Sequence, residues 1–234
     1  MKLQKGNMLM EALLAVAIIG MVSAAAMPML KAGRTEEAAR AVADDMSSFQ
    51  RIAAQHFISN RSAYEAAMKD GTGADKLCMV GVNPDTGVGG VQSNSTTQHT
   101  CAIDGAMLKY LLAMPKDMNL TNRFGETWVA VFRQIYDKET TPKPTGAVDM
   151  LVISAVVNGV AAQVIPDADR HSELVSAATI LGGTGGYLPD ADRSTCVAQR
   201  ATTKYEVCGN GWKVKLDEFI STADLTAFSN RLAK

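Results

Sequence analysis

Apolar residues form one nearly unbroken stretch close to the start of the chain. From Met8 to Leu30 the sequence is apolar apart from Glu11, Ser23 and a few small residues. A helix rises about 1.5 Å per residue, so this stretch would span roughly 35 Å, while the hydrocarbon core of a membrane is about 30 Å thick. The pattern therefore predicts a helix over residues 7–30 that can cross a membrane.

The apolar pattern continues past Leu30 with the spacing of an amphipathic helix. Side chains of this kind recur at intervals of three and four residues: Val42, Met46, Phe49, Ile52, Ala53 and Phe57. Most charged residues of the same stretch fall between these positions, which is typical of a helix with one buried side. We expect residues 31–58 to continue the apolar helix and to pack against a globular head over residues 59–234.

Strand signals follow in the middle of the head. Thr127–Tyr136 and Val148–Val157 are rich in β-branched and aromatic residues, and Asn158-Gly159 predicts a hairpin into a further strand at Val160–Ile165. Thr140–Thr145 contains two prolines and predicts a stiff connecting loop. These elements predict an α+β fold in which a long N-terminal helix packs on an antiparallel sheet.

Glycine and small polar residues mark the remaining irregular segments. The stretch Gly71–Thr100 is rich in Gly, Asn, Ser and Thr, and it predicts a long surface loop. Asp169–Leu181 predicts a helix that the glycine-rich run Gly182–Gly186 brings to an end. No Gly-Lys-Ser/Thr follows this run, and it ends a helix instead of opening one, so a phosphate-binding loop is not indicated.

Charge and cysteine content narrow the class of protein. Lys and Arg number 23 against 24 Asp and Glu, so the net charge of −1 gives no electrostatic basis for binding nucleic acid. Four cysteines, Cys78, Cys101, Cys196 and Cys208, lack the CxxC spacing of zinc or redox sites and predict disulfides in an oxidising compartment. Three pairings are possible, and we favour Cys78 with Cys101 and Cys196 with Cys208.

Catalytic and metal-binding patterns are weak in this sequence. The three histidines, His56, His99 and His171, have no serine, cysteine or carboxylate arrangement that indicates a nucleophilic or metal site. The tetrad Asp-Ala-Asp-Arg occurs at 167–170 and at 190–193, where helix capping or a solvated turn is favoured over calcium binding. We expect no enzyme activity, no cofactor and no metal.

The residues around the apolar stretch orient it in the membrane. Lys2 and Lys5 precede it, while the charges just after it nearly cancel, so the positive-inside tendency places the N-terminus in the cytoplasm. Glu11 is unusual, because a carboxylate in an apolar span costs on the order of 2.5 kcal/mol or more unless it is paired or neutralised. One alternative is that the stretch is a simple, uncleaved membrane anchor, but Glu11 would then have no role.

These residues resemble the type IV prepilin signal, in the run Lys5-Gly6, Asn7-Met8-Leu9-Met10-Glu11 and the alanines and leucines that follow. The resemblance implies that a prepilin peptidase cuts after Gly6 and methylates the new N-terminus at Asn7. It also implies a glutamate at the fifth mature position, here Glu11, and a kinking proline, here Pro28. Gly20 and Pro28 would loosen the helix locally.

A second resemblance concerns the last third of the head. Leu174–Leu181, then Gly182–Tyr187, and later Cys196 with Cys208–Lys213, look like the constant region of the shufflon-type minor pilin of conjugative thin pili. They are also similar to minor pilins of the type IVb class. The resemblance implies a filament subunit with other pilins as partners and a role in attachment or conjugation at a host or recipient cell surface.

The expected protein is therefore a minor pilin, held in the bacterial inner membrane before assembly and in an extracellular pilus afterwards. Within the class, the rivals are a major pilin and a pseudopilin of type II secretion. A rival of another class is a soluble periplasmic binding protein, released by cleavage of an ordinary secretory signal after Ala24-Ala25-Ala26. That rival predicts a mature chain that starts near Met27.

Overall fold

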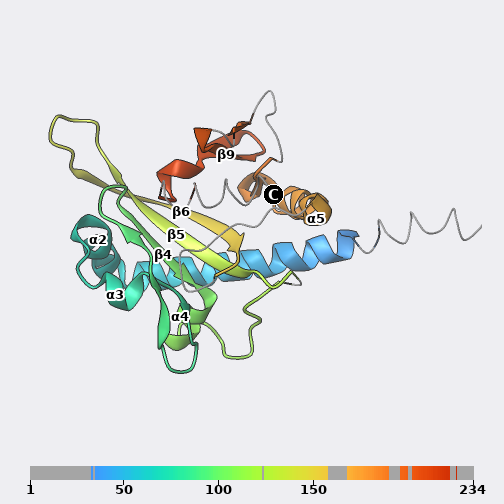
Figure 1. Ribbon diagram of the computed structural model, residues 1–234, viewed down its shortest axis with the longest axis horizontal. Helices are drawn as coiled ribbons and strands as arrows, with labels where there is room; N and C mark the ends of the chain where they lie inside the picture. Colours follow the sequence, from blue (N-terminus) through green and yellow to red (C-terminus); the bar gives the residue numbers. More distant parts are fainter. Residues whose placement is uncertain are drawn as a thin grey trace, which may run out of the picture.

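A long helix opens the described part of the chain and lies along the long axis of the molecule (Figure 1). The computed structural model describes residues 35–122, 124–157, 168–189, 196–199 and 202–221, together with residues 33 and 225. The helix covers residues 35–59, which agrees with the amphipathic pattern. Its buried side consists of small and apolar residues at helical spacing: Ala39, Val42, Ala43, Phe49 and Ala53.

Two shorter helices follow the long helix. Helix α2, Arg61–Asp70, ends at Gly71, which adopts the left-handed conformation (φ 83°) that glycine accepts without strain. Helix α3, Ala74–Leu77, leads into Cys78. Tyr64 and Met68 of α2 are fully buried and join the core beneath the long helix.

The centre of the head is a four-stranded antiparallel sheet in the order β3-β4-β5-β6. The strands are β3 (Asn94–Ser95), β4 (Thr100–Asp104), β5 (Thr127–Tyr136) and β6 (Pro144–Ala155). Strand β5 has the predicted bounds. Strand β6 begins within the segment predicted as a loop, because proline is tolerated at the first residue of a strand, particularly at the edge of a sheet.

Strand β5 is buried on both faces, and this explains its nearly continuous apolar sequence. On one face, Phe132 stacks on Phe57 of the long helix, with ring centroids 4.8 Å apart. On the opposite face, Val129 and Val131 pack in a second cluster that contains Phe219. The fold is therefore α+β, with the antiparallel sheet placed between the long helix and the C-terminal elements.

The stretch Gly71–Thr100 is not the long loop that its composition predicts. It contains α3 and a two-stranded antiparallel hairpin, β1 (Met79–Val82) with β2 (Gly89–Gln92), as well as β3. Its glycines mark turns and close backbone approaches between short strands: a Cβ on Gly90 would lie 2.6 Å from the carbonyl oxygen of Val80. Helix α4, Gly105–Tyr110, follows β4 and packs beside this hairpin.

The C-terminal part builds a second, smaller sheet. Its helix α5 (Ala168–Ile180) lies within one residue of the predicted helix at each end, and a 3-10 turn η1 (Gly182–Thr184) follows it. The strands are β7 (Gly186–Tyr187), β8 (Ala198–Gln199), β9 (Lys204–Gly209) and β10 (Trp212–Lys215), with η3 (Leu216–Glu218) after them. Strand β9 is central, since β10, β7 and β8 all pair with it.

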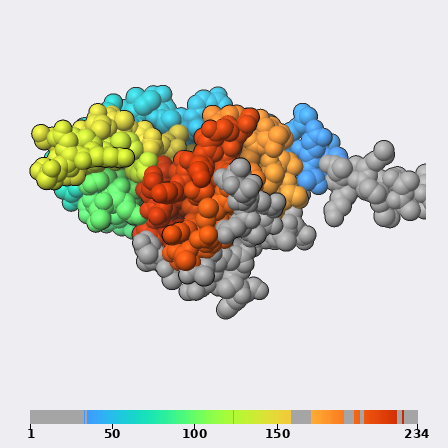
Figure 2. All heavy atoms as spheres, turned by 90° about the horizontal axis from the view of Figure 1, so that it is seen from above, coloured from blue at the N-terminus to red at the C-terminus, as the bar shows by residue number. Residues whose placement is uncertain are grey.

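Seen from above, these C-terminal elements form one face of the head (Figure 2). They appear in red beside the orange α5, and the yellow tip of the β5–β6 hairpin extends past them at one end. The predicted hairpin at Asn158-Gly159 and the strand Val160–Ile165 lie outside the described residues.

Candidate functional site

The residues that carry the prepilin resemblance lie before the described part of the chain. Gly6, Asn7, Glu11, Gly20 and Pro28 all fall there, so the structure gives no geometry for processing or assembly. The predicted membrane-spanning stretch, residues 7–30, lies there too. Across the residues that are described, none of the helices has the length and apolar character needed to cross a membrane.

The first disulfide joins Cys78 to Cys101, with a Cα–Cα distance of 5.1 Å. Cys78 follows α3 and Cys101 lies in β4, and both side chains are fully buried. The bond closes a segment of 23 residues that contains the β1–β2 hairpin. By the chain-entropy estimate, closing such a segment stabilises the fold by about 3 kcal/mol.

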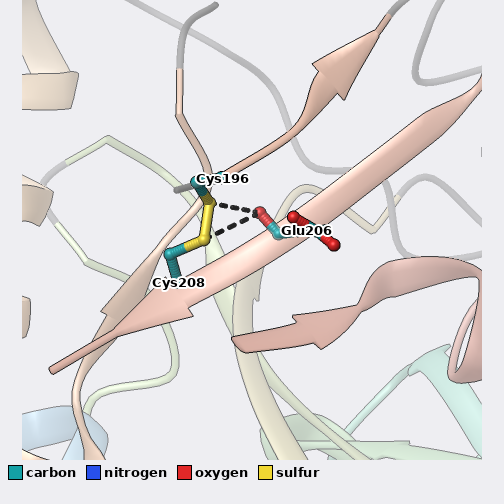
Figure 3. A group of neighbouring side chains, drawn as sticks. All are labelled: Cys196, Glu206 and Cys208. Carbon is teal, nitrogen blue, oxygen red and sulfur yellow. Dashed lines mark hydrogen bonds between the residues drawn. A yellow bond between two sulfur atoms is a disulfide. The ribbon is translucent and has the colours of Figure 1, made fainter. Parts of the chain in front are cut away.

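The second disulfide joins Cys196 to Cys208 of β9, with a Cα–Cα distance of 6.2 Å. Together with Glu206, these cysteines form a group whose potential ligand atoms lie within 4.8 Å of one another. The bonded sulfurs are not thiolates, so they do not supply the ligands of a metal site. Figure 3 shows the disulfide against the backbone of Glu206, whose carbonyl oxygen lies 3.3 Å from Cys196 Sγ.

The Glu206 carboxylate is already engaged within the protein. Its Oε2 atom accepts a hydrogen bond from the backbone N–H of Val197 at 3.1 Å, and its Oε1 atom lies 3.2 Å from Lys213 Nζ. These contacts tie β9 to β10 and to the residue that precedes β8. Cys196, Glu206 and Cys208 therefore stabilise the small sheet. The disulfide pairing in the structure is Cys78 with Cys101 and Cys196 with Cys208.

The glycine-rich run and the Cys-Gly-Asn-Gly-Trp segment contact each other directly. Gly186 of β7 pairs with Gly209 of β9, and Trp212 Nε1 donates a hydrogen bond to the carbonyl oxygen of Gly183 at 2.8 Å. A Cβ atom on Gly186 would lie 2.6 Å from the indole ring of Trp212. The glycines therefore leave room for the tryptophan, and they do more than end a helix.

Gly185 brings helix α5 into the same cluster. A Cβ atom at this position would lie 2.0 Å from the carbonyl oxygen of Ala178 in α5. Only glycine permits so close an approach between two backbones. The two motifs of the minor-pilin resemblance are thus one packing unit that fixes α5 against the small sheet.

A buried ion pair that no sequence pattern predicts links α5 to the residue that precedes β5 of the central sheet. Arg170 Nη1 lies 2.9 Å from Glu126 Oε1, and the two side chains are 5% and 2% exposed. The other carboxylate oxygen, Oε2, accepts hydrogen bonds from Asn122 Nδ2 at 2.9 Å and from Ser154 Oγ at 2.6 Å. Removing one partner of such a pair leaves a buried charge, which is strongly destabilising.

A further set of polar contacts holds the C-terminal segment on the sheet. Arg133 of β5 forms ion pairs with Asp149 of β6, at 2.7 Å, and with Glu218 of η3, and its guanidinium lies 4.6 Å from the ring centre of Phe219. Gln98 Nε2 donates to the carbonyl oxygen of Asp217 at 2.6 Å. Elements far apart in the sequence are therefore joined across the second face of the sheet.

The histidines lie in separate places. His56 Nδ1 lies 2.9 Å from the hydroxyl of Tyr64, and burial lowers the pKa of His56 and raises the pKa of Tyr64. His99 stacks on Tyr136 with ring centroids 3.8 Å apart, and His171 is near Tyr187. Within the described residues, none of these contacts places a nucleophile, a base and an orienting group together.

The described residues form a head with two disulfides that packs on a long helix. Comparisons with protein-family models, with curated proteins and with solved structures found no match. The long helix and the two disulfides are the features that bear most directly on the function.

Proposed function

We propose that this chain is a minor subunit of a type IV pilus-like filament, processed by a prepilin peptidase after Gly6 and assembled through its N-terminal helix. One observation carries the proposal. The helix over residues 35–59, whose apolar side packs on the antiparallel sheet, follows in sequence the apolar stretch Met8–Leu30, which contains Glu11 and comes directly after Gly6 and Asn7. In the proposed subunit, the predicted membrane-inserting segment therefore comes directly before the helix that packs on the sheet of the head.

Charge pairing gives the proposed assembly a physical basis. After cleavage, the new ammonium group at Asn7 of one subunit can neutralise the Glu11 carboxylate of its neighbour inside the apolar filament core. Leaving either charge alone there costs about 3–5 kcal/mol, so the pair fixes the axial position of each subunit. The partners in this proposal are the peptidase, the inner membrane before assembly, and other pilin subunits afterwards.

The head supports an extracytoplasmic location in this proposal. Both disulfides join buried cysteines, and disulfides persist in oxidising compartments such as the bacterial periplasm and the cell surface. With Lys2 and Lys5 on the cytoplasmic side, the head would lie outside the inner membrane. After assembly it would be exposed on the filament, and its proposed role there is attachment or conjugation.

Replacing Glu11 by valine tests the assembly step. We expect Glu11→Val to be inserted and cleaved normally but to be lost from sheared filaments, because the ammonium at Asn7 of the neighbour then has no partner. Glu37→Val is the matched control, since it makes the same substitution at an exposed position of the long helix. The amounts of each variant in membranes and in sheared filaments are compared by immunoblot.

Two outcomes would contradict the proposal. Normal levels of Glu11→Val in filaments would mean that the charge pair does not direct assembly. Absence of the unmodified protein from filaments, in cells that make them, would mean that the chain is not a filament subunit.

A further inference from the structure

Three large apolar side chains are exposed around helix α4. Val88 is 72% exposed, Leu112 is 79% exposed and Tyr110 is 43% exposed. Single exposed apolar residues are common on protein surfaces, whereas adjoining ones indicate a place of contact. We call Val88, Tyr110 and Leu112 the α4 patch.

The packing of Tyr110 brings two separate segments of the chain together in this patch. Its ring lies against Gly87, where a Cβ atom would be only 2.4 Å from the Tyr110 ring. Val88 is the next residue in the turn between β1 and β2, and Leu112 follows Tyr110 by two residues. The Cys78–Cys101 disulfide closes the segment that contains this turn, and the approach of Tyr110 to Gly87 joins the turn to the end of α4.

Leu112 adopts a backbone conformation that its side chain disfavours. Its φ is 58°, in the left-handed region, at the position just after the C-cap residue Leu111 of α4. Glycine is the usual residue there, because a side chain at this position is strained. The head alone would therefore be more stable with glycine, so the presence of an exposed leucine points to a use outside the head.

The loop that carries Leu112 is braced from within the protein. The Leu112 N–H donates to the carbonyl oxygen of Lys109 at 2.9 Å, and Lys109 Nζ donates to the carbonyl oxygen of Lys116 at 2.8 Å. These hydrogen bonds tie the loop back to α4 at two points. The leucine is thus presented to solvent in a defined position.

Size and position indicate what kind of partner could bind. A stable interface between two free proteins buries about 800 Å² on each partner, which is far more than three side chains can supply. Such a small patch is effective only when another connection already holds the partners close together. Figure 1 shows α4 beside the long helix and not beyond either of its ends.

We propose that the α4 patch contacts the head of an adjoining subunit in the same filament, and that Leu112 is its central residue. This inference rests on the proposed function, because packing of the N-terminal helices supplies the connection that the small patch needs. The adjoining head would offer a small apolar surface that covers Leu112 and Tyr110. The contact would not hold two heads together in the absence of the helices.

The substitution Leu112→Gly distinguishes an effect on the stability of the head from an effect on filament assembly. The full chain, solubilised in detergent, should unfold at the same or a higher temperature than the unmodified protein, because the backbone strain is removed. Its fraction in sheared filaments should fall on the order of tenfold, which is the effect expected for losing one buried leucine contact. Thr203→Gly is the matched control, since Thr203 also has a positive φ (52°) but lies in the C-terminal sheet region.

Tyr110→Ser provides a second variant, and Ile58→Ser, at a 66% exposed position on the long helix, provides its control. We expect Tyr110→Ser to lower incorporation and Ile58→Ser and Thr203→Gly to leave it unchanged. If both patch variants enter filaments at the level of the unmodified protein, the proposed contact of the α4 patch is wrong, and the proposed function still stands. Failure of the unmodified protein to enter filaments would overturn both.

Discussion

The indole ring of Trp212 occupies the space that a side chain at Gly209 would need. A Cβ atom on Gly209 would lie 2.2 Å from Trp212 Cε2 and 2.6 Å from the carbonyl oxygen of Gly185. Trp212, Gly209 and Gly186 follow one another across three paired strands. The small sheet is thus organised around one aromatic residue and the glycines that make room for it.

Gly209→Ala should therefore destabilise the head. The added methyl group meets both a ring and a backbone oxygen, and overpacking of this kind typically costs about 1–3 kcal/mol. Gly211→Ala is the matched control: no atom lies within 4 Å of its Cβ position, and only its left-handed conformation (φ 83°) opposes the substitution. Denaturant unfolding of the full chain in detergent should give a larger loss for Gly209→Ala than for Gly211→Ala. Equal losses would mean that Trp212 moves aside freely.

Arg170→Ala should cost about 3–5 kcal/mol, because Glu126 would be left as a buried charge without its guanidinium partner. Arg40→Ala is the control, since the Arg40–Glu36 pair on the long helix is exposed and should contribute less than about 0.5 kcal/mol. The two variants are compared in the same unfolding experiment. A similar small effect of both would show that the buried pair does not hold α5 on the sheet.

His56 should make stability depend on pH. Burial lowers the pKa of His56 below its usual value of 6.5, so the folded state resists protonation more than the unfolded state does. The contribution of neutral His56 is present above pH 6.5 and is lost as the pH falls through the lowered pKa. His56→Gln removes this titrating group. Between pH 7.5 and pH 5, the free energy of unfolding should therefore fall more steeply for the unmodified protein than for the variant. Identical pH profiles for the two proteins would contradict this role.

The sequence predicted those elements whose signal lies in their own residues. Strand β5 was located correctly because it is buried on both faces and its apolar run, rich in β-branched and aromatic residues, is nearly continuous. Helix α5 was located within one residue at each end because the glycine-rich run that begins at Gly182 marks where it stops. By contrast, the composition of Gly71–Thr100 predicts a loop. The short strands β1 and β2 within it depend on pairing with each other, and their glycines have the composition of a loop.

In the candidate site, too, some features could be predicted from the sequence and others depend on contacts between distant residues. The sequence-neighbour disulfides could be proposed by considering three possible pairings, and the structure has that arrangement. The Arg170–Glu126 pair could not be found, because the two residues are far apart in sequence and each is of a type that is usually exposed. Leu112 was also missed, because its positive φ and its exposure become visible only in three dimensions.

The most direct test of the central claim is the N-terminal sequence and mass of the mature chain. The protein is purified from cells that contain a prepilin peptidase and from otherwise identical cells that lack it. The account predicts a chain that starts at Asn7 in the first cells and keeps residues 1–6 in the second. A chain that starts near Met27, or an intact Met1 in both, would contradict processing as a pilin and the filament function with it.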